Sequence, residues 1–181
     1  VSVGGRAMTL SRARGLMGAR QAGARVIATV RTERDLGTPA NYGADHVLLL
    51  DDSFTERIKE LAPEGIDHIV EVALGANITK DIQVLAPGGS ISTYATDVPM
   101  PVIPAWELVF INARIFFVGS DDIPKSAKAE AVEATNQLLK NGWKDFQIAS
   151  LLSLDEIAKA HALVEHPSRP GRVILSILDH L

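Results

Sequence analysis

The residues whose types most clearly suggest ligand binding follow a β-branched apolar run, Arg25–Val30. Arg31 comes directly after this run and is followed by Thr32, Glu33 and Arg34. At this strand end of a dinucleotide-binding sheet, an acid receives the ribose hydroxyls of NAD, whereas a basic residue accommodates the extra phosphate of NADP. Arg31 and Thr32 offer the charge-assisted and hydroxyl donors that a dianionic phosphate prefers. The alternative is that the two arginines are surface residues with Glu33 as their partner.

A second candidate binding feature lies upstream, where Gly4 and Gly5 follow the apolar residues Val1–Val3. The first strand-to-helix turn of such a sheet carries a glycine-rich loop, which brings backbone N–H groups close to a pyrophosphate. The later glycines of that loop are missing, because residues 6–14 contain none. The segment by itself therefore favours an ordinary strand-to-helix turn.

Charge and composition narrow the possible partners. Residues 1–34 hold seven arginines and one acid, a charge of +6, so the rest of this chain of net charge −4 carries −10. A basic segment on an acidic body favours a local anionic ligand, although a solvated basic helix face is the alternative. The net negative charge argues against a general nucleic-acid binder. No apolar run approaches the ~18 residues of a membrane span, and the absence of cysteine excludes thiolate zinc ligands. We expect a cytoplasmic protein.

The elements that must position these residues alternate along the chain. Strands are expected at residues 25–30, 46–50, 66–72, 90–94, 113–118, 147–151 and 172–178, with a strand end at 1–3, and helices at 53–61, 77–85, 124–140 and 154–165. Ser53 with Glu56, and Ser153 with Glu156, have the capping-box spacing. Strands that alternate with helices predict βαβ units and a parallel sheet, because a parallel crossover needs a helix-length connection.

Five stretches resemble a known family in their order and spacing: Ala22–Val30, Gly43–Val47, Gly65–Val72, Leu85–Gly89 and Pro170–Leu175. Together they are similar to the zinc-independent quinone oxidoreductase branch of the medium-chain dehydrogenase/reductase superfamily, over roughly residues 21–181. The resemblance implies an α/β fold with a Rossmann-type doubly wound parallel sheet in residues 1–142. Residues 143–181 would be a segment that returns to a GroES-like catalytic domain, most of which is absent here.

The resemblance also implies an activity and a set of cofactor contacts. The family transfers a hydride from NADPH to a quinone or an activated alkene and needs no metal. Besides Gly4 and Gly5, the expected NADP(H) contacts are Thr29, Arg31 and Thr32 at the adenosine phosphate, Glu71, Val72 and Gly75 after the fourth strand, Tyr94, Ala95 and Thr96 after the fifth, and Phe117, Val118 and Gly119 near the nicotinamide. Two positions depart from the family pattern. Asp35 stands where a lysine is frequent, and residues 6–10 replace the glycine loop.

The sequence also suggests how the chain assembles and which other functions it could have. The sheet edge near Ile115–Val118 would pair with its copy in a homodimer, and the strands expected at 147–151 and 172–178 would pair with each other, pair across a dimer or be poorly ordered. The apolar segments Trp106–Ile111 and Arg114–Val118 are interpreted as partly core and partly dimer edge. Without its catalytic domain, this chain alone is expected to catalyse little. The alternative function is a non-catalytic Rossmann-like module that binds a nucleotide or a partner. A methyltransferase is disfavoured because Val30-Arg31 replaces its acidic strand-end residue.

Overall fold

The computed structural model describes residues 16, 18–40, 42–119, 121–141, 148–166 and 171–177. The chain divides into two units, Val1–Asn141 and Gly142–Leu181. No helix within the described ranges is both long and apolar enough to cross a membrane.

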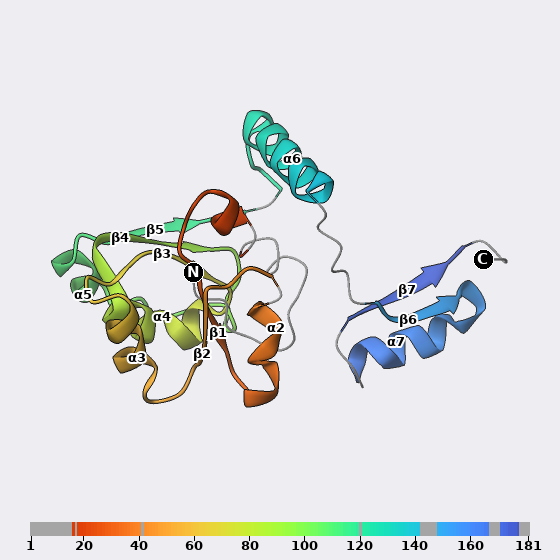
Figure 1. Ribbon diagram of the computed structural model, residues 1–181, viewed down its shortest axis with the longest axis horizontal. Coiled ribbons are helices and arrows are strands. Elements are labelled where there is room, and N and C mark those ends of the chain that lie inside the picture. Colours follow the sequence, from red (N-terminus) through yellow and green to blue (C-terminus); the bar gives the residue numbers. More distant parts are fainter. Residues whose placement is uncertain are drawn as a thin grey trace. The chain divides into compact units, whose positions relative to one another are not determined.

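All strand pairs described in the first unit are parallel (Figure 1). One sheet contains β1 (Ile27–Val30) and β2 (His46–Leu49), and the other contains β3 (Ile66–Glu71), β4 (Leu85–Thr93) and β5 (Arg114–Phe117) in that order. Helical segments lie between successive strands: η1 (Glu33–Asp35), α2 (Gly37–Ala40), α3 (Phe54–Leu61), α4 (Leu74–Val84) and α5 (Ala105–Phe110). The parallel α/β fold expected from the sequence is confirmed.

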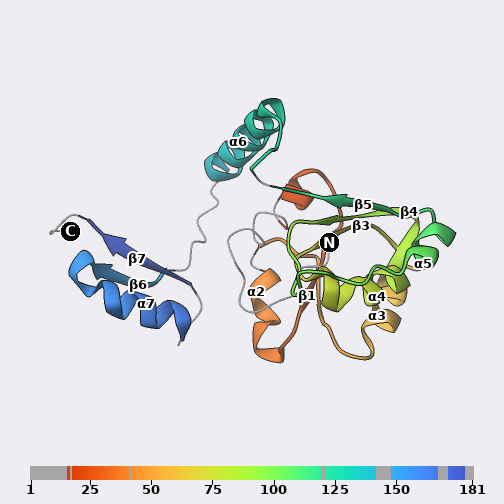
Figure 2. The ribbon, with the colours of Figure 1, turned by 180° about the vertical axis from the view of Figure 1, so that it is seen from behind.

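The strand order fits a doubly wound sheet of the Rossmann type. In the Rossmann strand order 3-2-1-4-5-6, β2 and β1 correspond to strands 3 and 2. β3, β4 and β5 correspond to strands 4, 5 and 6. Figure 2 shows β3, β4 and β5 side by side from the opposite direction. The strand end expected at residues 1–3 lies outside the described residues.

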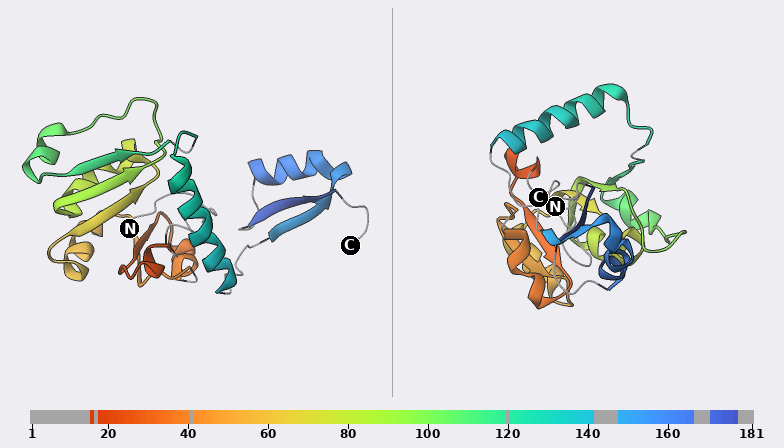
Figure 3. Two further views of the ribbon diagram at one scale, coloured as in Figure 1. Left: turned by 90° about the horizontal axis from the view of Figure 1, so that it is seen from above. Right: turned by 90° about the vertical axis from the view of Figure 1, so that its right-hand side faces the viewer.

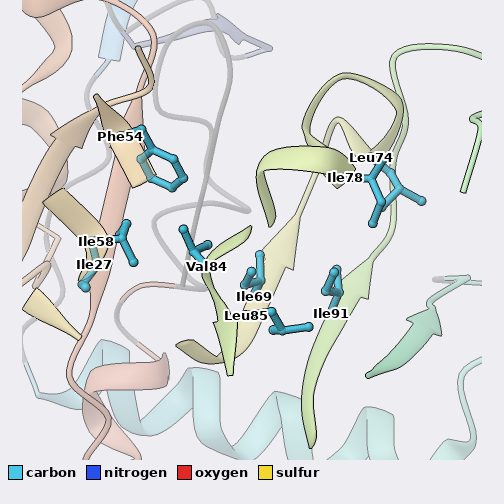
Figure 4. Packing of buried hydrophobic residues seen from close by; sticks show 9 residues of the cluster. All are labelled: Ile27, Phe54, Ile58, Ile69, Leu74, Ile78, Val84, Leu85 and Ile91. Carbon is cyan, nitrogen blue, oxygen red and sulfur yellow. The ribbon is translucent and has the colours of Figure 1, made fainter. Parts of the chain in front are cut away.

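The core lies between the sheets and their helices (Figure 4). Ile69 of β3 and Ile91 of β4 are partners in the strand register, and each is at most 1% exposed. Helices α3 and α4 bury residues four positions apart, which is the spacing of one helix face. The core cluster consists of Ile27, Phe54, Ile58, Ile69, Leu74, Ile78, Val84, Leu85 and Ile91. Burial of this apolar face therefore fixes β3, β4 and α4 relative to one another.

Strand β4 and helix α4 begin earlier than the sequence predicted. Leu85 already pairs with Ile66, after which the register shifts so that His68 pairs with Ser90. Residues 86–89 therefore bulge from β4, and Gly88 adopts a φ of 75° there. The turn expected at Pro87-Gly88-Gly89 is thus an irregularity inside a longer strand. Helix α4 begins at Leu74, three residues before the expected start.

Two helix caps and one core segment predicted from the sequence can be compared with the structure. Ser53 is the N-cap residue of α3 as expected, but its side chain makes no capping hydrogen bond, because its hydroxyl donates to Asp51 Oδ1 at 3.0 Å instead. The capping box of Ser153 and Glu156 is confirmed. The core reading of the segment from Trp106 is wrong for its aromatic residues, since Trp106 is 71% and Phe110 78% exposed. Their rings stack on each other with centroids 6.1 Å apart.

Beyond the sheets, the first unit contains α6 (Lys125–Lys140), none of whose residues is buried. The second unit contains β6 (Ile148–Ser153), η2 (Leu154–Glu156), α7 (Ile157–Glu165) and β7 (Arg172–Ser176). Strands β6 and β7 pair in parallel, and α7 lies along them (Figure 3). Of the three expectations for these two strands, mutual pairing is confirmed.

Candidate cofactor-binding site

A cavity of about 380 Å³ opens where β4 and β5 end. Because parallel strands all end at the same edge of a sheet, side chains that follow them gather there. The cavity is lined by Leu74, Thr93, Tyr94, Ala95, Thr96, Pro99, Pro101, Phe117, Val118 and Gly119. The structure thereby brings six predicted site residues together, namely those at positions 94–96 and 117–119.

The two predicted triplets lie opposite each other because the strand ladder continues past its end. The Val118 N–H donates to the Thr93 carbonyl at 2.8 Å, one residue beyond β5. Tyr94 is 46% and Phe117 71% exposed, so both rings are accessible. The resulting site is mainly apolar and aromatic, and its hydroxyl-bearing lining residues are Thr93, Tyr94 and Thr96. Such a lining suits a flat organic ring better than a phosphate.

The remaining wall is formed by the start of α4 and the segment after β4. The Gly75 N–H donates to Thr96 Oγ1 at 3.4 Å, and the Ala76 N–H donates to Asp97 Oδ1 at 2.9 Å. A Cβ atom on Gly75 would lie 2.7 Å from Val98 Cγ2 and 2.8 Å from Asp97 Oδ1. Gly75 itself does not line the cavity. It permits the close approach that holds Thr96 in the cavity wall.

Glu71 lies inside the fold, not on the cavity wall, and is 0% exposed. Its Oε1 accepts hydrogen bonds from the Val72 N–H at 2.6 Å, the Ala73 N–H at 2.5 Å and the Asn77 side-chain amide at 3.1 Å. Glu71 therefore ties down the turn from β3 into α4, whose next residue, Leu74, lines the cavity. Val72, half-buried in this turn, is likewise not among the lining residues.

Glu71 has a second buried acid as its neighbour. Asp81 of α4 is 2% exposed, and burial, the charge of Glu71 and a hydrogen bond to Glu71 raise the pKa of Asp81 to about 9. At neutral pH this carboxyl group is therefore protonated.

The residues predicted for the adenosine phosphate do not line the large cavity. Thr29 is 1% exposed and lines a separate internal cavity of about 10 Å³. Arg31 and Thr32 are exposed just after β1, and the Thr32 hydroxyl donates to Asp35 Oδ2 at 2.5 Å. The Thr32 hydroxyl, which was expected to donate to the phosphate, thus already donates to the Asp35 carboxylate. Gly4 and Gly5 lie outside the described residues.

The described side chains contain no candidate metal centre. They include no group of three or more His, Asp or Glu residues that could hold a metal ion, and the sequence has no cysteine. The described side chains therefore do not fit zinc.

Sequence reasoning missed the lining residues Leu74, Thr93, Pro99 and Pro101. Leu74 was placed before a helix that was expected to begin later. The two prolines stand in a segment, residues 97–104, that follows a predicted strand end. Their position was the available signal, because chain segments that follow strand ends form the ligand edge of such sheets.

The fold and the cavity define an α/β domain of the Rossmann type with its ligand edge at the ends of β4 and β5. The zinc-binding dehydrogenase family matches residues 15–136, and the chain belongs to this family. Human quinone oxidoreductase is 27% identical over 164 residues, which cover 87% of this chain and 48% of that protein. The chain thus spans about half the length of the curated relatives it matches. The resemblance to the quinone oxidoreductase branch of the medium-chain superfamily is confirmed.

Solved structures share the fold at lower sequence identity. A mycobacterial protein in complex with NADPH has a TM-score of 0.76 at 19% identity, covering 96% of this chain and 55% of that chain. An NAD-dependent alcohol dehydrogenase has a TM-score of 0.78 at 20% identity, covering 98% of this chain and 50% of that chain. At these identities the likeness establishes the fold, and the two names differ in their cofactor.

Proposed function

We propose that this chain is the cofactor-binding part of an NADPH-dependent oxidoreductase that reduces a quinone or an activated alkene. The observation that carries the proposal is the apolar cavity of about 380 Å³ at the ends of β4 and β5. Its volume lies within the range of roughly 300–1,000 Å³ typical of small-molecule sites, and its lining suits a nicotinamide ring. When bound, the nicotinamide cofactor supplies the hydride.

The chain's own residues bind and orient. Tyr94 and Phe117 offer aromatic surfaces, and Leu74 and Val118 form apolar walls that exclude water from the reacting face. Exclusion of water favours hydride transfer because it prevents loss of the reactive group to solvent. The groups that contact the quinone or alkene are proposed to lie in the other half of the full-length protein. This chain alone is therefore expected to bind cofactor with little turnover.

Calorimetric titration of the 181-residue chain with NADPH tests the site. We expect a dissociation constant on the order of micromolar, and Ala95→Trp, which places an indole at the cavity, abolishes binding. The matched control is Ala129→Trp on the exposed face of α6, which leaves binding unchanged. Binding that survives Ala95→Trp would rule out this cavity as the cofactor site.

Full-length protein tests the chemistry, with NADPH oxidation followed against a panel of quinones and enones. Turnover supports hydride transfer. Cofactor binding without turnover in the full-length protein would favour the non-catalytic nucleotide-binding module instead. Turnover that is unchanged by a strong chelator would support the metal-free mechanism, and loss of turnover that added zinc restores would refute it.

The preference for NADPH over NADH is proposed from Arg31 at the end of β1, because the neighbouring Thr32 hydroxyl is already bound to Asp35. The Arg31 side chain is exposed to solvent, so a phosphate can reach it without rearrangement of the core. Loss of one charge-assisted bond to phosphate costs about 1.5–3 kcal/mol. Arg31→Ala should therefore weaken NADPH binding roughly 10- to 100-fold and leave NADH binding unchanged. Equal losses for both cofactors would contradict a phosphate contact.

We further propose a homodimer through the edge near Ile115–Val118. β5 is the outer strand of its described sheet, and Phe116 and Phe117 are 50% and 71% exposed. An exposed apolar edge strand is a template for pairing with a second copy. Phe116→Lys should convert the dimer to a monomer in sedimentation experiments, whereas Val132→Lys on α6 should not. A wild-type chain that stays monomeric at all concentrations would refute the interface.

A further inference from the structure

Three polar side chains are buried together where β3 meets α4. Glu71 is 0%, Asp81 2% and Asn77 4% exposed. Acidic residues are almost never fully buried unless they are paired, and here two of them share one site. The cluster lies behind the turn that leads to Leu74 and is not part of the cavity lining.

The Glu71 carboxylate and the Asp81 carboxyl group share one buried polar cluster, which favours a proton between them. Glu71 Oε1 accepts from two backbone N–H groups, and Asn77 Nδ2 donates to both Glu71 oxygens, at 3.1 and 3.2 Å. Asp81 follows Asn77 by four residues and so shares its helix face. Asp81 is within hydrogen-bonding reach of Glu71, and no group in the described part of the chain donates to its Oδ2. Two carboxylates form no hydrogen bond unless one is protonated.

The described surroundings of Asp81 provide no cation that would favour its charged form. α4 packs against α3, β3 and β4. β4 contains no ionisable side chain. On α3, Glu56, Lys59 and Glu60 are exposed, and Arg57 is bound to Asp51 and the Leu49 carbonyl. On β3, Asp67 is exposed and His68 is bound to Ser90. Glu71 is thus the charged group that acts on Asp81, and together with burial it raises the pKa of Asp81 to about 9.

We propose that Asp81 is a positioning residue that donates a shared proton to Glu71 and thereby holds the 72–74 turn against the cofactor cavity. Glu71 binds the N–H groups of Val72 and Ala73, and the following residue, Leu74, lines the cavity and donates to the Ala95 carbonyl at 3.5 Å. Removal of the proton would put two negative charges side by side in a buried site. Movement of the turn relieves that repulsion and alters the cavity wall. The link to cofactor binding rests on the proposed function.

The pH dependence of unfolding tests the shared proton. The folded-state pKa of Asp81, about 9, exceeds the ordinary value of 3.8, so the native state holds one more proton than the unfolded state between these values. The contribution of this group to stability therefore decreases as pH rises, and the unfolding constant increases tenfold per pH unit. Asp81→Asn keeps an amide donor to Glu71 but cannot titrate. From pH 6 to pH 8, the ratio of the wild-type to the Asp81→Asn unfolding constant should rise about 100-fold.

Asp67→Asn, which removes an exposed acid from β3, is the matched control and should keep the wild-type pH dependence. A constant ratio of the wild-type to the Asp81→Asn unfolding constant across this range would overturn the proposal. The unfolding comparison needs no cofactor, so it decides on the proton even if NADPH does not bind.

Cofactor titration tests the positioning role. The NADPH affinity of the wild type should fall between pH 7 and pH 9.5 more steeply than that of Asp81→Asn, while Asp81→Leu, which offers no donor, should bind at least tenfold more weakly at pH 7. The amide of Asp81→Asn should restore binding, which a purely steric role would not require. Identical pH profiles for the wild type and Asp81→Asn would overturn the positioning role, and the two folded proteins decide this even if Asp81→Leu fails to fold. No NADPH binding by the wild type would refute the proposed function instead.

Discussion

Substitution of Gly75 by alanine separates the packing of the cavity wall from ordinary helix propensity. Gly75 is the second residue of α4. An added Cβ would meet Val98 Cγ2 at 2.7 Å and Asp97 Oδ1 at 2.8 Å. Both contacts are too short to persist, so the Val98 side chain and the Asp97 carboxylate must move away from position 75.

The expected magnitude follows from opposing effects. Alanine is favoured over glycine by up to about 1 kcal/mol in a helix. Overpacking costs roughly 1–3 kcal/mol. Displacement of Asp97 also weakens its hydrogen bond to the Ala76 N–H, which contributes about 0.5–1.5 kcal/mol. The clash therefore prevails, and we expect a net destabilisation of about 1–3 kcal/mol.

Urea denaturation and NADPH calorimetry measure the two consequences of Gly75→Ala. The matched control is Gly37→Ala in the first turn of α2, where nothing lies within 4 Å of the added Cβ. Gly37→Ala should be neutral or stabilising and leave cofactor binding intact, whereas Gly75→Ala should weaken both stability and binding. If Gly75→Ala stabilised the chain as Gly37→Ala does, with unchanged NADPH affinity, the close approach would have no role in shaping the cavity.

Three further substitutions test other parts of the fold. Ile91→Ala in the core should destabilise the first unit by about 2–5 kcal/mol in urea denaturation, because Ile91 is 0% exposed. Hydrogen bonds from the Val26 N–H and the Arg20 side chain hold the pKa of Asp45 below 3.8. The stabilisation from this ionised carboxylate is present above pH 3.8 and is lost as the pH falls further. Asp45→Asn should therefore lose less stability than the wild type on acidification from pH 4 to pH 2. Ser153→Ala should remove the capping box and destabilise α7 by about 1 kcal/mol, which hydrogen exchange of the α7 amides measures.

The strands could be predicted from sequence because their apolar, β-branched runs are local signals. The start of α4 could not, because its cap is not local. The residue before the helix, Ala73, has no side chain that can cap it. Asp97 accepts from the Ala76 N–H instead, across 21 residues of sequence. A capping rule that examines neighbouring positions cannot find such a partner, so the predicted helix began too late and Leu74 was missed.

The candidate site shows the same division between local and tertiary information. The rule that ligands lie at the carboxyl ends of parallel strands was sufficient to find positions 94–96 and 117–119. It gave Glu71 a cavity-lining role, yet alternation along β3 already indicates the interior. Ile69 and Glu71 are two residues apart and therefore point to the same face, and Ile69 is 1% exposed. Pro99 and Pro101 follow a predicted strand end, which is the signal that the rule uses, but their place in the cavity wall also depends on the tertiary contact of their segment with α4.

The first turn of α4 also indicates which part of a dinucleotide this cavity can receive. A helix N-terminus attracts phosphate when its backbone N–H groups are unpaired. Here each N–H from position 72 to 76 has an acceptor: Glu71 for Val72 and Ala73, the Ala95 carbonyl for Leu74, Thr96 for Gly75 and Asp97 for Ala76.

Two of these acceptors, Glu71 and Asp97, are acids, so a phosphate at this helix end would have to displace one carboxylate and approach the other. The cavity therefore favours a ring without negative charge over a pyrophosphate. Inorganic pyrophosphate should accordingly leave the urea midpoint of the wild type unchanged, and Asp97→Asn tests whether the Asp97 charge is the cause. Stabilisation of the variant by pyrophosphate, with none for the wild type, would show that Asp97 is the barrier. Stabilisation of the wild type would refute the assignment of this cavity to the uncharged end of the cofactor.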